Sequence, residues 1–135
     1  MSSVAAMLDS HPTSRGAIDH EKLARCIELM TECAQACTAC ADACLAEESV
    51  SELIRCIRTD LDCADICGTT ARVLSRRTAP DSGLVDQLLT ACVTACESCA
   101  QECAEHSAHH RHCEVCAQVC RACSQACRDL VGALG

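Results

Sequence analysis

The sequence predicts an all-α fold, an antiparallel up-down-up-down four-helix bundle with a short N-terminal helical arm. Two observations lead to this prediction. The cysteines from Cys113 to Cys127 follow one another at steps of 3, 4, 3 and 4 residues, and a helix with about 3.6 residues per turn keeps such positions on one face. Three earlier segments repeat this pattern between short stretches of cap and turn residues, and helices with short connections pack most simply as an up-and-down bundle. We expect the arm to cover residues 1–16 and the bundle to cover residues 17–135.

Two helices are expected in the first third of the chain. Val4, Met7 and Leu8 lie at helical spacing and indicate a short helix in the arm. The first helix of the bundle is expected from about Ile18 to Glu47, because its apolar residues recur on one stripe that becomes almost pure cysteine toward the end. That stripe consists of Leu23, Cys26, Met30, Cys33, Cys37, Cys40 and Cys44.

The second helix of the bundle is expected to begin near Val50 and to end near Thr78. Ser49 and Glu52 have the spacing of a capping box, in which both side chains accept hydrogen bonds from backbone amides at the helix start. Pro80 disfavours helical geometry in the residue before it. The inward stripe of this helix is Leu53, Cys56, Asp60, Cys63, Cys67, Thr70 and Leu74.

The third and fourth helices follow the same rhythm. Residues 81–83 supply turn and cap residues for the third helix, and Ser107 can cap the fourth. The stripe of the third helix is Val85, Leu89, Cys92, Cys96, Cys99, Cys103 and His106, and that of the fourth is Cys113, Cys116, Cys120, Cys123, Cys127, Leu130 and Leu134.

The two ends of this bundle are expected to differ. Both tight connections, between the first two helices and between the last two, fall at one end, where thiol-rich helix ends meet four histidines. His106 continues the third stripe past Cys103, and His110 continues it again if that helix persists. For His109 and His112, a solvated loop is an equally good explanation. Ordinary apolar packing is expected at the opposite end, from Leu23, Leu74, Val85, Leu89, Leu130 and Leu134.

Composition narrows the class of protein. The chain has 17 cysteines, a net charge of -8 and no Phe, Tyr or Trp. This charge disfavours nucleic acid, whose phosphates attract basic faces, and no apolar run approaches the length that spans a membrane. Residues 1–16 carry no export signal. We therefore expect a cytoplasmic protein whose thiols stay reduced and whose charge favours cationic partners.

Rows of inward thiols favour a soft metal ion. Two cysteines three or four residues apart on one helix face are close enough to hold one ion. Thiolates select Cu(I), Zn(II) or iron-sulfur clusters, and Cu(I) accepts the low coordination number that two sulfurs provide. Because one Cu(I) offsets the charge of one thiolate, a filled core need not bury many uncompensated charges. Cysteine can also act as a small apolar filler, but rows of free thiols are an oxidation liability that alanine avoids.

Three other inward residues are candidate ligands. Asp60 lies at a core position where an unpaired carboxylate is costly, so it either binds or steers metal or accepts hydrogen bonds from thiols. His106 has an imidazole that can relay or bind copper. Met30 fits an ordinary core methionine better than a thioether ligand.

These stripes resemble the four-helix-bundle copper storage proteins of bacteria, and specifically the cytosolic branch that lacks a twin-arginine signal. The resemblance covers about Ile18 to Leu130 and rests on the four cysteine stripes and the histidines between the last two helices. It implies a core that binds many Cu(I) ions, assembly as a homotetramer and no catalytic turnover. It also implies an opening at His106 and His110 with Asp60 deeper. A copper chaperone is a candidate donor of the ions. The metal ligands implied are Cys26, Cys33, Cys37, Cys40, Cys44, Cys56, Cys63, Cys67, Cys92, Cys96, Cys99, Cys103, Cys113, Cys116, Cys120, Cys123, Cys127, Asp60, His106 and His110.

Three alternative functions share the thiols. A zinc or general heavy-metal buffer prefers isolated four-ligand tetrahedral sites, whereas these sulfurs run continuously along the core. An iron-sulfur electron-transfer protein favours the loop spacing C-x2-C-x2-C, which differs from helical threes and fours. A disulfide-stapled secreted bundle is disfavoured by the missing export signal and by cysteines that lie in rows on the same helix.

Overall fold

Helices make up the framework of the protein. The computed structural model describes residues 2–12 and 20–133, and this part of the chain contains no strand. The helices are α1 (Ser3–Ser10), α2 (His20–Leu45), the 3-10 turn η1 (Val50–Glu52), α3 (Ile54–Ser75), α4 (Ser82–Glu105) and α5 (Arg111–Leu130).

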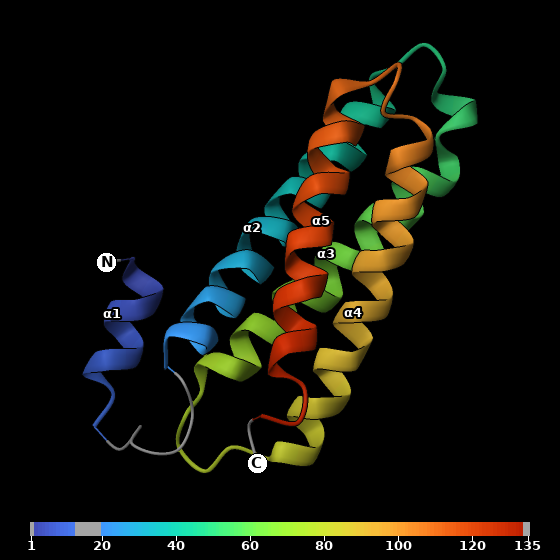
Figure 1. Ribbon diagram of the computed structural model, residues 1–135. Helices are drawn as coiled ribbons and strands as arrows, with labels where there is room; N and C mark the ends of the chain where they lie inside the picture. The colour runs from blue at the N-terminus through green and yellow to red at the C-terminus, as the bar shows by residue number, and fades with distance from the viewer. Residues whose placement is uncertain (1, 13–19, 134–135) are drawn as a thin grey trace.

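The four long helices form an antiparallel bundle. They run alternately up and down along one axis (Figure 1). α2 packs against α3 and α5, and α4 packs against the same two helices. The predicted up-down-up-down fold is therefore confirmed. α1 lies against the outside of α2 and buries Leu8 in the common core. The predicted helix start at Ile18 and residues 13–16 of the arm lie outside the described residues, so the division at residue 16 stays a prediction.

The connection between α2 and α3 differs from the predicted capping box. The Ser49 side chain makes no capping hydrogen bond, and α3 begins at Ile54 after a 3-10 turn. Leu53 explains the difference. Its side chain is fully buried, and the tighter 3-10 turn is closed by a hydrogen bond from the Leu53 amide to the Val50 carbonyl at 2.9 Å. The buried Leu53 thus precedes the first residue of α3. At its other end, α3 stops at Ser75, three residues earlier than predicted.

The predicted N-terminal cap is correct for α4 and wrong for α5. The predicted cap of α4 is confirmed, because Asp81 Oδ1 accepts a hydrogen bond from the Leu84 amide at 3.1 Å. The predicted cap of α5 is wrong: the Ser107 hydroxyl donates to the Ala104 carbonyl at 2.8 Å and so closes the end of α4. α5 begins at Arg111 with His110 in the cap position. Because α4 ends at Glu105, His110 does not continue the α4 stripe.

The bundle has one apolar end and one end with polar connections. The apolar end is confirmed for the described residues Leu23, Leu74, Val85, Leu89 and Leu130, which are all buried; Leu134 lies outside them. We call the opposite end, formed by the α2–α3 and α4–α5 connections, the mouth (Figure 1). None of the described helices is both long and apolar enough to cross a membrane.

Candidate metal centre

The core of the bundle is lined by sulfur. All 17 cysteines are reduced and buried, and none exposes more than 2% of its surface. The expectation that the cysteines point inward is therefore confirmed on all four long helices. Since buried thiols in an apolar setting are protonated and behave as small hydrophobes, the bundle can pack without metal.

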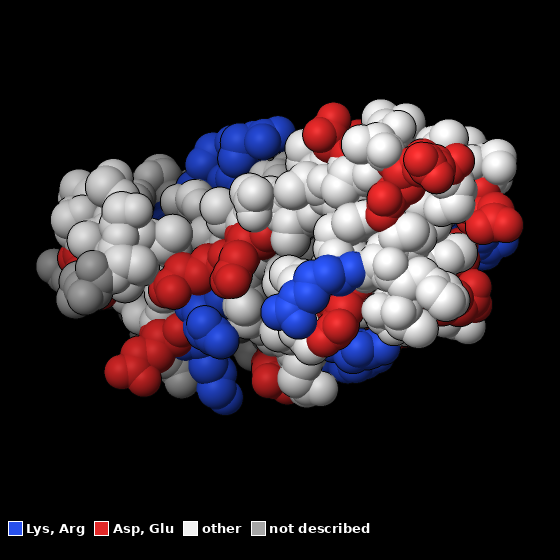
Figure 2. Space-filling view, turned by 90° about the horizontal axis from the view of Figure 1, so that it is seen from above, with Lys and Arg blue, Asp and Glu red and all other residues white. Residues whose placement is uncertain are grey.

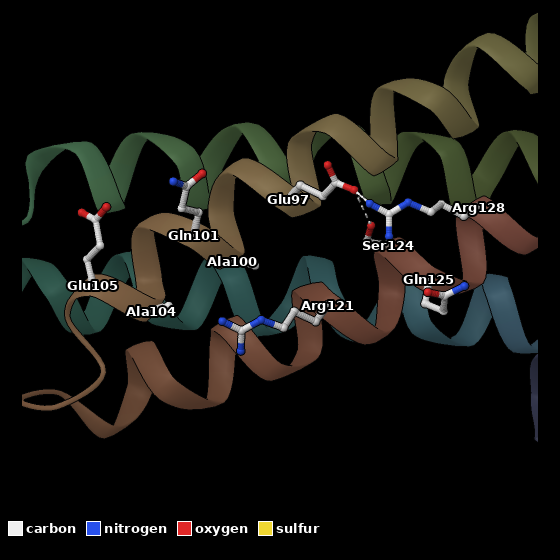
Figure 3. A pocket seen from close by; sticks show the side chains of 9 residues that line it. All are labelled: Glu97, Ala100, Gln101, Ala104, Glu105, Arg121, Ser124, Gln125 and Arg128. Carbon is white, nitrogen blue, oxygen red and sulfur yellow. Dashed lines mark hydrogen bonds and ion pairs between the residues drawn. The ribbon is translucent and has the colours of Figure 1, made fainter.

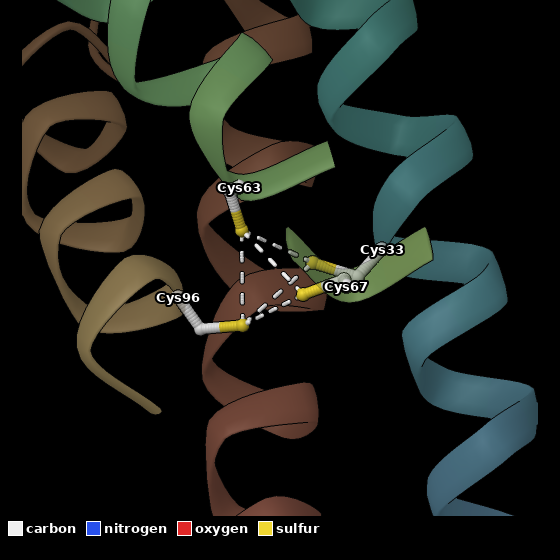
Figure 4. Close-up of side chains that lie close together, drawn as sticks. All are labelled: Cys33, Cys63, Cys67 and Cys96. Atoms are coloured by element: carbon white, nitrogen blue, oxygen red, sulfur yellow. Dashed lines mark hydrogen bonds between the residues drawn. The ribbon is translucent and has the colours of Figure 1, made fainter. Parts of the chain in front are cut away.

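Thiols near the middle of the bundle form a group of four. Cys33, Cys63, Cys67 and Cys96 come from three helices, and their sulfur atoms all lie within 4.8 Å of one another (Figure 4). The Sγ atoms of Cys67 and Cys96 are 3.5 Å apart, and those of Cys63 and Cys96 are 3.7 Å apart. Four convergent sulfurs make this a candidate site for a soft metal ion.

Neighbouring groups share members. Cys33 and Cys63 also belong to a group with Cys37 and Cys120, and these last two belong to a third group with Cys99 and Cys116. The Sγ atoms of Cys37 and Cys120, at 3.5 Å, link the second group to the third. The sulfurs thus form a continuous ladder along the bundle axis and not a set of separate four-ligand sites.

Asp60 lies inside this ladder. Its Oδ1 atom accepts hydrogen bonds from Cys99 at 3.0 Å, Cys116 at 3.2 Å and Cys103 at 3.5 Å. The carboxyl is fully buried, and burial, with the neighbouring sulfurs of Cys116 and Cys99, raises its pKa far above the usual range. Of the two roles that the sequence left open for Asp60, the structure shows that of an acceptor of thiol hydrogen bonds.

The ladder ends at the mouth on a histidine. Cys40, Cys44, Cys113 and His112 form a group with one nitrogen and three sulfurs. The Nδ1 atom of His112 is 3.4 Å from the sulfur of Cys40 and 3.6 Å from that of Cys113. The hydrogen bond with Cys103 lowers the pKa of the Cys40 thiol to about 6.

His106 and His110 lie at the mouth but face carboxylates. His106 Nε2 is 3.4 Å from Glu102 Oε1, and His110 Nδ1 contacts Glu47. Among the described residues, neither ring has a hydrogen bond with a thiol. Their assignment as metal ligands stays a prediction, and the structure adds His112, which the sequence interpretation left undecided. A signal for it existed: His112 precedes Cys116 by four residues and so shares the inward face of α5.

A surface groove of about 710 Å³ between α4 and α5 has a different character (Figure 3). Glu97 forms an ion pair with Arg128 there and accepts a hydrogen bond from Ser124 at 3.5 Å. No cysteine or histidine lines this groove. The soft-metal chemistry of the described residues therefore lies in the core and at the mouth.

An antiparallel helical bundle with a continuous thiol lining defines a class of protein that binds soft metal ions in its core. The chain belongs to the copper storage protein family, whose sequence model matches residues 19–132. Its role is thus copper storage. None of the curated proteins compared with the chain matches it.

Solved structures of a relative agree with this assignment. The copper storage protein Ccsp from Streptomyces lividans, in a structure loaded with 10 copper equivalents, is 52% identical with a TM-score of 0.95, over 98% of this chain and 100% of that one. A structure of copper loading to a cytosolic copper storage protein from the same organism, with five coppers, is 56% identical with a TM-score of 0.85, over 89% and 100%. A Ccsp variant with one histidine changed to alanine is 55% identical with a TM-score of 0.86, over 89% and 100%.

Proposed function

We propose that this protein stores many Cu(I) ions as thiolate complexes inside the bundle, for copper sequestration and homeostasis. The continuous ladder of buried sulfurs is the observation that carries the proposal. Its sulfur-sulfur distances of 3.5 to 4.0 Å suit bridging, because one metal ion with metal-sulfur bonds of about 2.3 Å, as for zinc, can span two such sulfurs. A sulfur shared by two groups serves two neighbouring ions.

Cu(I) fits the ladder for reasons of charge. Each ion that binds replaces a thiol proton, so the charge of the core changes little as it fills. Asp60 fits this charge balance, because burial raises its pKa and so favours the neutral carboxyl among the thiols. Loading releases protons to the solvent.

The shared sulfurs favour copper over the alternatives drawn from the sequence. Zinc prefers four ligands of its own in a closed tetrahedral site, and Cys33, Cys37, Cys63 and Cys120 each belong to two adjacent groups. Filling every group with a separate four-coordinate ion would require more sulfurs than the ladder contains. A monovalent ion that accepts two or three sulfurs avoids this conflict.

The mouth is the proposed route for copper. It carries the histidines, and the carboxylates Glu47, Glu48, Glu52, Glu105 and Glu114 lie on or beside its two connections. Figure 2 looks onto the mouth end from above, and Asp and Glu side chains with few Lys or Arg gather in the right-hand part of that view. This charge attracts cations. We propose that His106, His110 and His112 receive the ion and that Asp60 meets it deeper in the core.

Further parts of the proposal come from the sequence and its family resemblance. They are a cytoplasmic location, a homotetramer, delivery by a copper chaperone and the absence of catalytic turnover. A cytoplasmic location suits the proposed function, because its reducing conditions keep free thiols available as metal ligands. Light scattering coupled to size exclusion measures the mass of the assembly, and a monomeric mass contradicts the tetramer.

Counting bound ions tests the storage function. Reduced, metal-free protein is titrated anaerobically with Cu(I) against a competing chelator, with Zn(II) at matched free concentration as the comparison. We expect Cu(I) to be preferred and saturation to approach on the order of one ion per thiolate, with proton release during loading. Saturation at one to a few ions, or a preference for Zn(II), contradicts the proposal.

Two cysteine variants sharpen this count. The sulfur of Cys37 lies within 4.0 Å of four others, whereas in the described part of the chain the sulfur of Cys26 contacts that of Cys127 alone, at 3.9 Å. Because a shared sulfur serves more than one ion, C37A is expected to lower the number of bound ions more than C26A. Equal losses contradict the shared ladder.

A further inference from the structure

Glu47 joins the two connections of the mouth. It lies between α2 and η1, and its Oε2 atom contacts two histidines of the α4–α5 segment. The Nε2 atom of His112 is 3.1 Å away, and His110 approaches through Nδ1. The side chain of Glu47 is 33% exposed, so it bridges the histidines at the boundary between solvent and core.

The contact with Glu47 defines the orientation of the His112 ring. A carboxylate only accepts hydrogen bonds, so the facing Nε2 atom carries the proton. In the neutral ring the other nitrogen, Nδ1, is then unprotonated, and this is the atom that faces the sulfurs of Cys40 and Cys113 at 3.4 and 3.6 Å. In this neutral tautomer the lone pair of His112 points at the outermost thiols of the ladder.

The second histidine reinforces this arrangement. The ring of His110 stacks on that of His112, with centroids 5.4 Å apart and 25° between the planes. Because both rings contact the same oxygen of Glu47, one carboxylate fixes two stacked imidazoles.

We propose that Glu47 is a positioning residue for copper uptake: it holds His112 with Nδ1 toward Cys40 and Cys113, so that an arriving Cu(I) ion meets one nitrogen and two sulfurs already in place. Glu47 does not touch the ion itself. Partners that orient a metal-binding histidine through its other nitrogen typically change metal affinity or activity 10- to 100-fold when removed. This inference rests on the proposed function. It assigns to Glu47 the role of orienting the His112 ring at the mouth.

The orientation can be tested without copper. Two-bond ¹H–¹⁵N NMR spectra of the metal-free protein distinguish the protonated from the unprotonated nitrogen of His112. We expect a single Nε2–H tautomer with an observable ring proton in the wild type, and loss of that proton to exchange with solvent in E47A. E47Q keeps an oxygen that accepts from Nε2–H and is expected to retain the proton. An unchanged His112 spectrum in E47A overturns the proposal.

The consequence for uptake is tested by loading kinetics. E47A is expected to slow binding of the first Cu(I) ions about 10- to 100-fold while the final number of ions stays unchanged. E48A is the control for charge: it removes the same mouth charge from an exposed neighbour that makes no hydrogen bond or ion pair in the described structure, and it is expected to slow loading much less than E47A. Circular dichroism checks that both variants keep the helices. A wild-type loading rate in E47A overturns the proposal.

A double-mutant cycle separates positioning from a general effect of charge. If Glu47 acts through His112, E47A adds no further slowing in an H112A background. Equal slowing in both backgrounds overturns the proposal. Failure of the storage function would look different, since the wild type would then saturate at a few ions, whereas the NMR result for His112 requires no metal.

Discussion

At the scale of single residues, Asp60 shows how a buried acid can suit a thiol core. Three thiols donate to one of its oxygens, and burial raises its pKa well above the usual range. The folded protein therefore holds this proton more tightly than the unfolded chain, in which an aspartate titrates near pH 3.9, to within about one unit. Above that pH the unfolded state gains stability by ionising, and the folded state becomes relatively less stable.

D60N tests this linkage. The amide cannot ionise, so the free energy of unfolding of the metal-free wild type should fall relative to that of D60N as pH rises above about 4. The slope of the difference approaches at most about 1.4 kcal/mol per pH unit. Urea denaturation between pH 4 and 8 measures it. D62N is the control, because Asp62 is exposed and paired with Arg58; parallel pH profiles for D60N and the wild type would contradict the assignment.

At the scale of the helices, the caps show that a capping motif in the sequence does not always form a cap in the structure. Ser49 and Glu52 have capping-box spacing, yet the Ser49 side chain caps nothing, because the buried Leu53 draws the chain into a 3-10 turn first. Asp81 caps α4 as predicted. The difference arises because a capping motif works only where the following backbone is free to enter the helix directly.

Two alanine substitutions compare these sites. D81A removes the hydrogen bond to the Leu84 amide and should lower the free energy of unfolding by about 1 kcal/mol. S49A removes no capping bond and should change it by less than about 0.5 kcal/mol. Urea denaturation of metal-free protein measures both. A loss in S49A as large as that in D81A would mean that Ser49 caps α3 in solution.

At the scale of the whole molecule, the two ends of the bundle have separate tasks. Leucines and a valine close one end, and thiols, histidines and carboxylates occupy the other. Apolar burial supplies stability at roughly 25 cal/mol per Å², whereas the sulfur ladder supplies ligands. Stability and metal capacity should therefore respond to different substitutions.

L89A tests this separation. Leu89 is fully buried at the closed end, and its truncation should lower the free energy of unfolding by about 2 to 5 kcal/mol. Under native conditions the number of bound Cu(I) ions should not change, because no thiol is removed. Thermal unfolding and the copper titration measure the two quantities. A lowered copper count in folded L89A would show that the closed end shapes the metal core.

The amino-acid sequence alone was sufficient for the fold, the inward direction of the cysteines and the shared position of the two tight connections. These features depend on helical periodicity, which is local and repeats along each segment. It also placed Asp60 in the core, although the choice between ligand and hydrogen-bond acceptor needed the contacts with Cys99, Cys103 and Cys116.

Only the tertiary structure could decide which histidine meets the thiols and how the sulfurs are grouped. His112 faces Cys40 because α4 ends early, at Glu105, and because Glu47, which lies 65 residues away in sequence, holds its ring. The shared thiol groups likewise join residues of three or four helices. Such contacts depend on the geometry of the connections and on packing between distant segments, and periodicity within one helix carries no information about either.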